Sequence, residues 1–228
     1  REVESIELPA GTAKISFTSG STGLPKGVCL SGAGLLETAH ALCVRLSDIG
    51  IARHLAVLPL AVLLENNAGI YAPLLRGAEI HLPALGSLGW RGMAGFDPQA
   101  LHRKVTEVHP DSLILVPELL KSWSLFLVHS GQRAPDGLSY VAVGGSHVEA
   151  NLMTQARQLG VPAYQGYGLT ECGSVVSLNR PGDDGKGVGR PLPHVRVTIR
   201  DGEIHVAGAM GDLRQVHRAV VEQVAEDG

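Results

Sequence analysis

Apolar positions recur through residues 31–160 with two alternating spacings, one near 3.6 residues and one typical of short strands. Leu35, Ala39 and Leu42 share one face of a predicted helix. Gly50 follows that helix, and glycine there predicts a helix terminus in the left-handed conformation. The chain therefore starts this region with an amphipathic helix and then alternates strands with helices.

Two further features support this alternation. Asp97 precedes Pro98, and an N-cap side chain followed by proline in the first turn marks the start of a helix. Residues 112–116 are apolar from Leu113 onward, which predicts a strand buried on both faces. The predicted strands are 54–58, 79–82, 112–116, 139–143 and 161–165, and the predicted helices are 66–75, 149–159 and segments beginning at Pro98 and Pro117. This order predicts an α/β fold with a mostly parallel sheet covered by helices.

The pattern changes after Tyr167. Residues 195–199 alternate between apolar and polar, Asp201 and Gly202 supply a tight turn, and residues 204–206 resume the alternation. This pattern predicts a C-terminal β-hairpin. The expected organisation is an α/β core over residues 1–180, a β-hairpin subdomain over 181–208, and an amphipathic C-terminal helix within 209–228.

Composition excludes several classes of protein. Hydrophobic residues make up 44% of the 228 residues and charged residues 18%, as in globular proteins. The net charge is −3 and only 4% of residues are aromatic, so neither a basic surface nor a set of stacking platforms for nucleic acid is expected. The longest apolar run, residues 55–64, includes Pro59 and is shorter than the roughly 20 residues needed to cross a bilayer.

The first residues of the chain and its cysteines indicate the cellular compartment in which the protein is expected. The chain opens without the apolar region of a secretory signal. Cys29, Cys43 and Cys172 are odd in number and lack the spacing of metal ligands. These features favour a reducing compartment, and we expect a cytoplasmic protein.

A loop rich in glycine and hydroxyl groups follows the strand-like run 13–17. Glycine lets backbone N–H groups turn toward an anion, hydroxyls donate to phosphate oxygens, and lysine adds positive charge. The P-loop pattern does not fit, because Gly27 follows Lys26 where a hydroxyl residue is required. By composition alone the loop also suits a polar surface connector. The residues predicted to bind phosphate are Thr18, Ser19, Gly20, Ser21, Thr22, Gly23 and Lys26.

Two more glycine-containing segments follow predicted strands. Residues 144–146 are Gly-Gly-Ser, and residues 164–171 read Tyr-Gln-Gly-Tyr-Gly-Leu-Thr-Glu. Taken alone, the first suits a strand-to-helix turn. Tyr167 would likewise suit a packed aromatic ring and Glu171 a solvated carboxylate.

Together these segments resemble the adenylate-forming superfamily, which includes acyl-CoA synthetases, luciferases and nonribosomal peptide adenylation domains. Residues 18–27 resemble its phosphate-loop signature, and residues 164–171 resemble its G-Y-G-x-T-E motif in the same chain order. Residues 144–146 end a strand where the family has a small-residue loop against adenine. Residues 187–191 and 202–208 resemble two of its structural elements. The pattern is most like that of a long-chain acyl-CoA synthetase.

The resemblance implies roles for individual residues. Tyr167 would stack on adenine, Thr170 would bond the α-phosphate, and Glu171 would help to hold Mg²⁺. Lys26 and its loop would clamp the β- and γ-phosphates. The implied catalytic residues are Lys26, Thr170 and Glu171, with Glu171 as metal ligand, and the ATP- or AMP-binding set adds Gly144, Gly145, Ser146, Gln165, Gly166, Tyr167 and Gly168 to the loop.

The implied reaction joins a carboxylic acid to ATP, giving acyl-AMP and pyrophosphate, and then to the thiol of CoA. Residues 58–65 resemble the segment beside the acyl tunnel, although Val62 stands where an aromatic residue or histidine is common. The segment lacks the aspartate of amino-acid-activating members, which favours a fatty or other hydrophobic acid. Two alternatives stay open: an acyl-AMP ligase that loads carrier-protein pantetheine, and a non-catalytic nucleotide-binding remnant.

Family members are much longer than this chain. The resemblance ends near Gly208, and the family's hinge and catalytic lysine are not found after it. We therefore expect a fragment of the large N-terminal domain that binds nucleotide weakly and turns over slowly or not at all.

Overall fold

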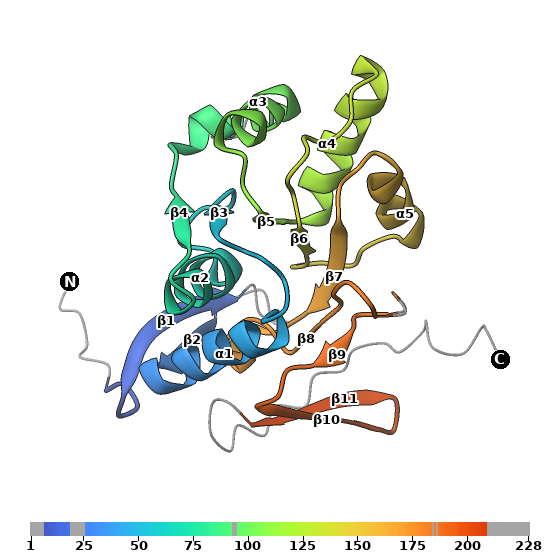
Figure 1. Cartoon of the computed structure of the whole chain (residues 1–228). Helices are drawn as coiled ribbons and strands as arrows, with labels where there is room; N and C mark the ends of the chain where they lie inside the picture. The colour runs from blue at the N-terminus through green and yellow to red at the C-terminus, as the bar shows by residue number, and fades with distance from the viewer. Residues whose placement is uncertain (1–6, 19–25, 93–94, 184, 186, 209–228) are drawn as a thin grey trace.

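The computed structural model describes residues 7–18, 26–92, 95–183, 185 and 187–208. Its centre is a seven-stranded sheet with the order β4-β3-β5-β6-β7-β8-β9 (Figure 1). The strands are β3 (Arg53–Leu55), β4 (Glu79–His81), β5 (Ser112–Leu115), β6 (Tyr140–Val143), β7 (Ala163–Tyr167), β8 (Ser177–Leu178) and β9 (Arg190–Pro191). The first five strands in the sheet order are parallel, and β8 and β9 continue the sheet in the antiparallel sense. The prediction of a mostly parallel sheet is confirmed.

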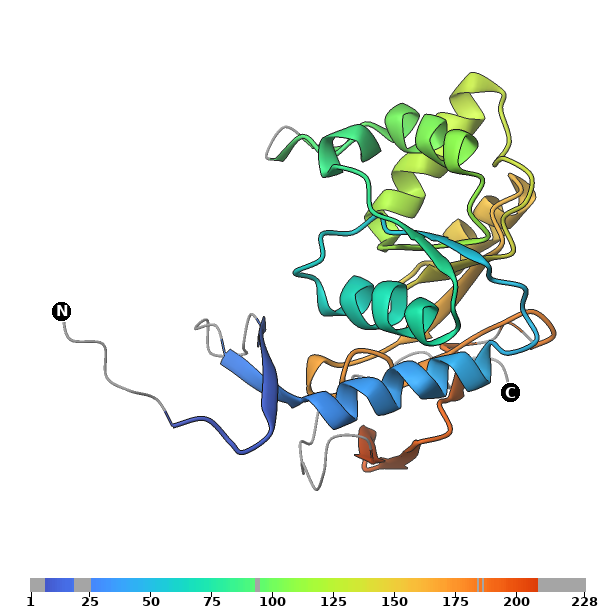
Figure 2. The ribbon, with the colours of Figure 1, turned by 60° about the vertical axis from the view of Figure 1, so that its left-hand side comes forward.

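Helices cover the sheet on both faces (Figures 1 and 2). Leu101, Leu113 and Trp123 belong to one buried cluster beneath α3, α4 and α5, and Leu42 and Ala72 belong to a second cluster beneath α1 and α2. The α/β fold class predicted from the alternation is therefore confirmed. The helices are α1 (Gly32–Arg45), α2 (Ala72–Leu75), α3 (Pro98–Val108), α4 (Pro117–Ser130) and α5 (Ala150–Gln158), with a π-helical turn η1 (Glu65–Tyr71) and 3₁₀ turns η2 (Leu85–Leu88) and η4 (Thr170–Cys172).

Local signals set several helix boundaries as predicted. The Asp97 carboxylate accepts hydrogen bonds from the backbone N–H groups of Gln99 and Ala100 at 3.0 and 3.3 Å, so α3 begins at Pro98. Gly160 follows α5 with a φ of +89°, the left-handed conformation that glycine adopts without strain.

The prediction that Gly50 ends α1 is wrong. The helix ends at Arg45 with Leu46 as its C-cap, and Gly50 is not left-handed. The Arg76 guanidinium donates to the carbonyl oxygens of Leu46 and Ile49, each at 2.7 Å. Arg76, the C-cap of α2, thus provides hydrogen-bond donors for carbonyl oxygens at and after the end of α1. The chain therefore does not need a left-handed glycine to satisfy them.

The strand predicted over 54–58 is shorter than expected. β3 ends at Leu55, and the next residues leave the strand ladder because the N–H groups of Val57 and Leu58 donate to the Glu65 carboxylate at 3.2 and 2.8 Å. A buried side-chain acceptor thus replaces a neighbouring strand.

Two hairpins lie outside the main sheet. The predicted C-terminal hairpin is confirmed as β10 (Val195–Arg200) and β11 (Glu203–Gly208), joined by Asp201 and Gly202 with φ of +52° and +75°. β1 (Thr12–Thr18) pairs with β2 (Lys26–Ser31) in a second hairpin, in which Thr18 faces Lys26. β2 was not among the strands predicted from the sequence. The helix predicted within 209–228 lies outside the described residues.

Among the described residues, no helix combines the length and apolar character that a bilayer crossing requires.

Candidate functional site

The carboxyl ends of β6 and β7 bring two of the predicted motifs together. These strands are parallel neighbours, with Val143 opposite Gln165. Gly144 packs closely on the next motif, since a Cβ added to it would lie 3.4 Å from the carbonyl oxygen of Gly166. In α/β sheets, ligands bind at this edge. The structure therefore places residues 144–146 and 166–171 where a ligand is expected.

The segment after β7 folds into a tight closed turn. A Cβ added to Gly168 would lie 1.5 Å from the carbonyl oxygen of Ser174, so only glycine allows this approach. The N–H groups of Cys172 and Ser174 both donate to the Leu169 carbonyl oxygen at 3.1 Å. The turn presents the half-buried side chains of Thr170 and Glu171.

Burial dominates the electrostatics of this turn. It raises the pKa of the Tyr167 phenol, and nearby Cys172 and Glu171 add to that shift. Burial also raises the pKa of the Cys172 thiol to about 11, with a further contribution from the Glu171 carboxylate. Both neighbours of Glu171 are therefore neutral at pH 7, and the carboxylate is the charge of the turn that could attract a cation.

We expect iodoacetamide to alkylate Cys172 roughly a hundredfold more slowly in the folded chain than in the unfolded chain at pH 8, because only the thiolate reacts. The rate in the folded chain should rise about tenfold per pH unit up to a pH near 11. Mass spectrometry of the labelled peptides separates Cys172 from Cys29 and Cys43. Equal rates in folded and unfolded protein would contradict the shift.

The predicted phosphate loop starts and ends on the β1–β2 hairpin. Thr18 ends β1 and is half-buried, while Lys26 begins β2 and is exposed. β2 lies against η4, the turn that carries Thr170 and Glu171. The other predicted loop residues, Ser19, Gly20, Ser21, Thr22 and Gly23, lie outside the described residues.

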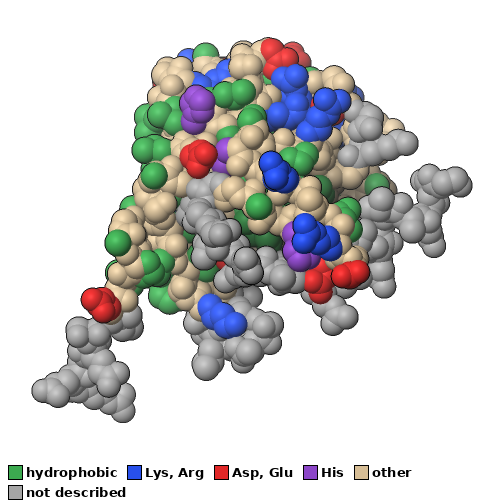
Figure 3. All heavy atoms as spheres, turned by 90° about the horizontal axis from the view of Figure 1, so that it is seen from below, with side chains coloured by type: hydrophobic (Ala, Val, Ile, Leu, Met, Phe, Trp, Pro, Cys, Tyr) green, Lys and Arg blue, Asp and Glu red, His purple; other side chains and the backbone are tan. Residues whose placement is uncertain are grey.

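The remaining predicted residues differ in position. Ser146 is exposed, and its hydroxyl donates to the Glu118 carboxylate at 3.5 Å. Gln165 lies within β7, where its carbonyl oxygen accepts from the Asn179 N–H at 2.8 Å. On the face shown in Figure 3, basic and acidic side chains are interspersed, and apolar side chains gather along one edge.

Magnesium fits the donor chemistry of the site. The described residues contain no group of three or more His, Cys, Asp or Glu that could hold a metal ion. Mg²⁺ in nucleotide sites is commonly held by one or two carboxylates together with phosphate oxygens and water. Glu171 would be the protein ligand of such an ion.

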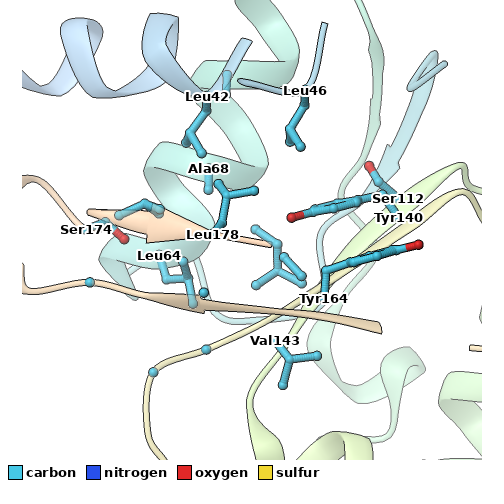
Figure 4. A pocket seen from close by; sticks show the side chains of 18 of the residues that line it. Leu42, Leu46, Leu64, Ala68, Ser112, Tyr140, Val143, Tyr164, Ser174 and Leu178 are labelled. Carbon is cyan, nitrogen blue, oxygen red and sulfur yellow. The ribbon is translucent and has the colours of Figure 1, made fainter. Parts of the chain in front are cut away.

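A cavity of about 280 Å³ borders the two motifs. It lies between α1, η1 and α2 on one side and β5, β6 and β7 on the other, and Figure 4 shows its mainly apolar lining. Tyr140 and Tyr164 stack in its wall, with ring centroids 5.1 Å apart and planes 4° from parallel. Its lining includes the motif residues Gly144, Gly145, Gly166, Tyr167, Gly168 and Thr170 and the apolar residues Leu42, Leu46, Leu64, Ala68, Val143 and Leu178.

A buried polar network forms part of the cavity wall. His54 Nδ1 lies 2.9 Å from the Ser112 hydroxyl, and His54 Nε2 lies 3.1 Å from Glu65 Oε1. A carboxylate only accepts, so its partner is an Nε2–H group, and with a neutral imidazole the Ser112 hydroxyl is the donor to Nδ1. Gly69 leaves room for the network, since a Cβ there would lie 1.9 Å from Glu65 Oε1.

This network was not predicted from the sequence. The three side chains belong to β3, η1 and β5, and only the fold brings them together. The available signal was a histidine and a glutamate flanking the apolar run 55–64. An ionisable residue at each end of so apolar a segment indicates a buried pair.

Comparisons with known proteins agree with the resemblance. A long-chain-fatty-acid–CoA ligase of Thermus thermophilus is 29% identical over 218 residues, covering 89% of this chain and 38% of that protein. A 2-succinylbenzoate–CoA ligase of Haemophilus influenzae is 29% identical over 200 residues, covering 86% of this chain and 39% of that protein. The chain thus spans about two fifths of the length of these relatives.

Solved structures show the same fold. The Bacillus subtilis O-succinylbenzoate coenzyme A synthetase in complex with ATP and magnesium matches with a TM-score of 0.71 at 24% identity, over 92% of this chain and 46% of that one. A long-chain-fatty-acid–CoA ligase of Archaeoglobus fulgidus matches with a TM-score of 0.75 at 21% identity, over 87% of this chain and 42% of that one. Residues 2–214 match the family model described as AMP-binding enzyme. The chain therefore belongs to the AMP-binding enzyme family.

Proposed function

We propose that this chain carries the ATP- and acid-binding part of an acid–thiol ligase, which converts a hydrophobic, fatty-type carboxylic acid to acyl-AMP and then to a CoA thioester. The observation that carries the proposal is that the predicted nucleotide motifs and the apolar cavity share residues. Gly144, Gly168 and Thr170 belong to the predicted nucleotide motifs and also line the apolar cavity. An acid held in that cavity has its carboxylate beside the α-phosphate of the nucleotide.

The apolar lining favours the acyl group that we propose. A 150 Å³ apolar cavity is large enough for about one benzene ring. The 280 Å³ cavity therefore has room for an aryl acid or an acyl chain of moderate length. Leu46, Leu64 and Leu178 would exchange contact with water for contact with the acyl group, which is the driving force for binding.

In the first step, a carboxylate oxygen of the acid attacks the α-phosphorus, and the bond between the α-phosphorus and the bridging oxygen of pyrophosphate breaks. Thr170 would donate its hydroxyl to an α-phosphate oxygen, and Tyr167 would offer a ring face to adenine. Lys26 would neutralise charge on the departing pyrophosphate. Glu171 would hold Mg²⁺, which would supply further positive charge beside the phosphates when bound.

In the second step, the thiol sulfur of CoA attacks the acyl carbonyl carbon, AMP leaves, and the thiol proton passes to solvent. The described residues contribute mainly by position here. The apolar walls around the acyl group exclude water, which competes with the thiol for the same carbonyl.

Equilibrium titration of labelled ATP in the presence of Mg²⁺ tests the nucleotide site. We expect Lys26→Ala and Glu171→Ala each to weaken binding about tenfold or more. The first removes a positive charge that would attract phosphate, and the second removes the carboxylate that would hold Mg²⁺. Lys121→Ala and Glu107→Ala, on exposed positions of α4 and α3, are matched controls and should leave the affinity unchanged. Unchanged affinity in both site variants would instead favour an inert scaffold.

Exchange of labelled pyrophosphate into ATP tests the chemistry. With an acid of moderate chain length we expect the isolated chain to exchange slowly or not at all, because it spans only about two fifths of the relatives' length. Rapid exchange would contradict the expectation that further segments are needed.

A further inference from the structure

The π-helical turn η1 is buried on two opposite sides. Glu65 and Gly69 face β3, where the Glu65 carboxylate meets His54. Asn67 faces the other way and contacts the loop after β7 through Gly173. Glu65 and Asn67 are both completely buried. π-Helical turns are rare and are frequently found at functional sites.

Asn67 anchors the turn that carries Thr170 and Glu171. Its Nδ2 donates to the carbonyl oxygen of Gly173 at 2.7 Å, and Gly173 closes that turn with a φ of +73°. Asn67 Oδ1 is buried and has no hydrogen-bond partner among the described residues. A buried amide left half-satisfied costs free energy that a leucine of similar volume would avoid. Packing alone therefore does not account for an asparagine here.

The neighbouring residue reaches the opposite side of the proposed site. The side-chain carbonyl oxygen of Asn66 accepts a hydrogen bond from Lys14 Nζ at 2.8 Å. Lys14 belongs to β1, the strand that leads to the predicted phosphate loop. Asn66 therefore hydrogen-bonds the β1–β2 hairpin, which leads to the predicted phosphate loop. Asn67 hydrogen-bonds the turn that carries Thr170 and Glu171.

We propose that Asn67 is a positioning residue, which holds Thr170 and Glu171 at the place where they meet the α-phosphate and Mg²⁺. This inference rests on the function proposed above. Glu171 sits two residues before Gly173, so loss of the anchor displaces the carboxylate with the turn. Displacements of about 1 Å can cost a factor of a hundred in a reaction that depends on position.

The test compares two buried asparagines. Asn179 is buried like Asn67, donates through Nδ2 to a glycine carbonyl (Gly187, at 2.9 Å), and also has an unpartnered Oδ1. We expect Asn67→Leu and Asn179→Leu to lower the melting temperature by similar amounts. Only Asn67→Leu should weaken binding of labelled ATP in Mg²⁺ by about tenfold.

Magnesium dependence and thiol labelling separate positioning from stability. The ratio of ATP affinities with Mg²⁺ and with EDTA should exceed one in the unaltered chain and in Asn179→Leu, and should fall to about one in Asn67→Leu. Iodoacetamide should label Cys172 faster in Asn67→Leu than in Asn179→Leu, a readout that needs no nucleotide. Asn67→Ser, whose hydroxyl is too short to reach Gly173, should give the same two changes if the leucine variant does not fold.

Two results would overturn the inference in distinguishable ways. A folded Asn67 variant that keeps both the magnesium ratio and the slow Cys172 labelling of the unaltered chain shows that Asn67 does not position the turn. An unaltered chain that binds no ATP contradicts the proposed function instead, and the inference then fails with it even if labelling changes.

Discussion

Glu65→Leu is expected to lower the free energy of unfolding by about 3–5 kcal/mol, because three buried donors lose their acceptor and each unmade hydrogen bond costs about 1–3 kcal/mol. The substitution leaves His54 without its acceptor and leaves the N–H groups of Val57 and Leu58 buried without a partner. Denaturation in urea, monitored by far-ultraviolet circular dichroism, gives this quantity.

Two controls show whether the network itself is responsible. Glu65→Gln keeps an acceptor of the same shape, and we expect it to cost less, about 1–3 kcal/mol. Glu107→Leu, at an exposed position of α3, should change the free energy of unfolding by no more than about 0.5 kcal/mol. A loss below 1 kcal/mol in Glu65→Leu would mean that the network contributes little to stability.

Gly168→Ala is expected to weaken Mg·ATP binding by about a hundredfold and to lower the melting temperature, because the turn that carries Thr170 and Glu171 has to open. The added Cβ would lie 1.5 Å from the Ser174 carbonyl oxygen and 2.6 Å from its carbon, and neither backbone atom can rotate away. Titration with labelled ATP and thermal denaturation measure the two effects.

Gly86→Ala is the matched control for that substitution. A Cβ added to Gly86 meets nothing within 4 Å, and its φ lies outside the left-handed region. Its affinity and melting temperature should match those of the unaltered chain. Unchanged affinity and melting temperature in Gly168→Ala would show that the turn has room for a methyl group at this position.

Local signals predicted most of the fold. α3 begins where Asp97 and Pro98 predicted, and the C-terminal hairpin turns at Asp201 and Gly202 as their preference for positive φ requires. β2 was missed because its alternation is short and carries a glycine near its start. The length of β3 was overestimated because the pattern of apolar residues cannot show that Glu65 will replace a strand partner.

The candidate site was predictable to the extent that it consists of contiguous motifs. Residues 144–146 and 166–171 meet because parallel neighbouring strands end at the same edge. Asn67 and Gly173 are 106 positions apart, and His54 and Ser112 are 58 positions apart, so no local pattern joins them. Such pairs depend on sheet order and on the extra residue in a π-helical turn, which single-chain periodicity does not reveal.

The hairpin of β1 and β2 shares no ladder hydrogen bond with the seven-stranded sheet and extends away from it beside α1 (Figure 2). A two-stranded ribbon of this kind has little stability of its own. Its orientation therefore depends on side-chain contacts, which include the hydrogen bond from Lys14 to Asn66 and the buried cluster of Leu30, Leu35 and Leu63. Because Lys26 begins β2, its position relative to the central sheet is set by those side-chain contacts and not by strand pairing.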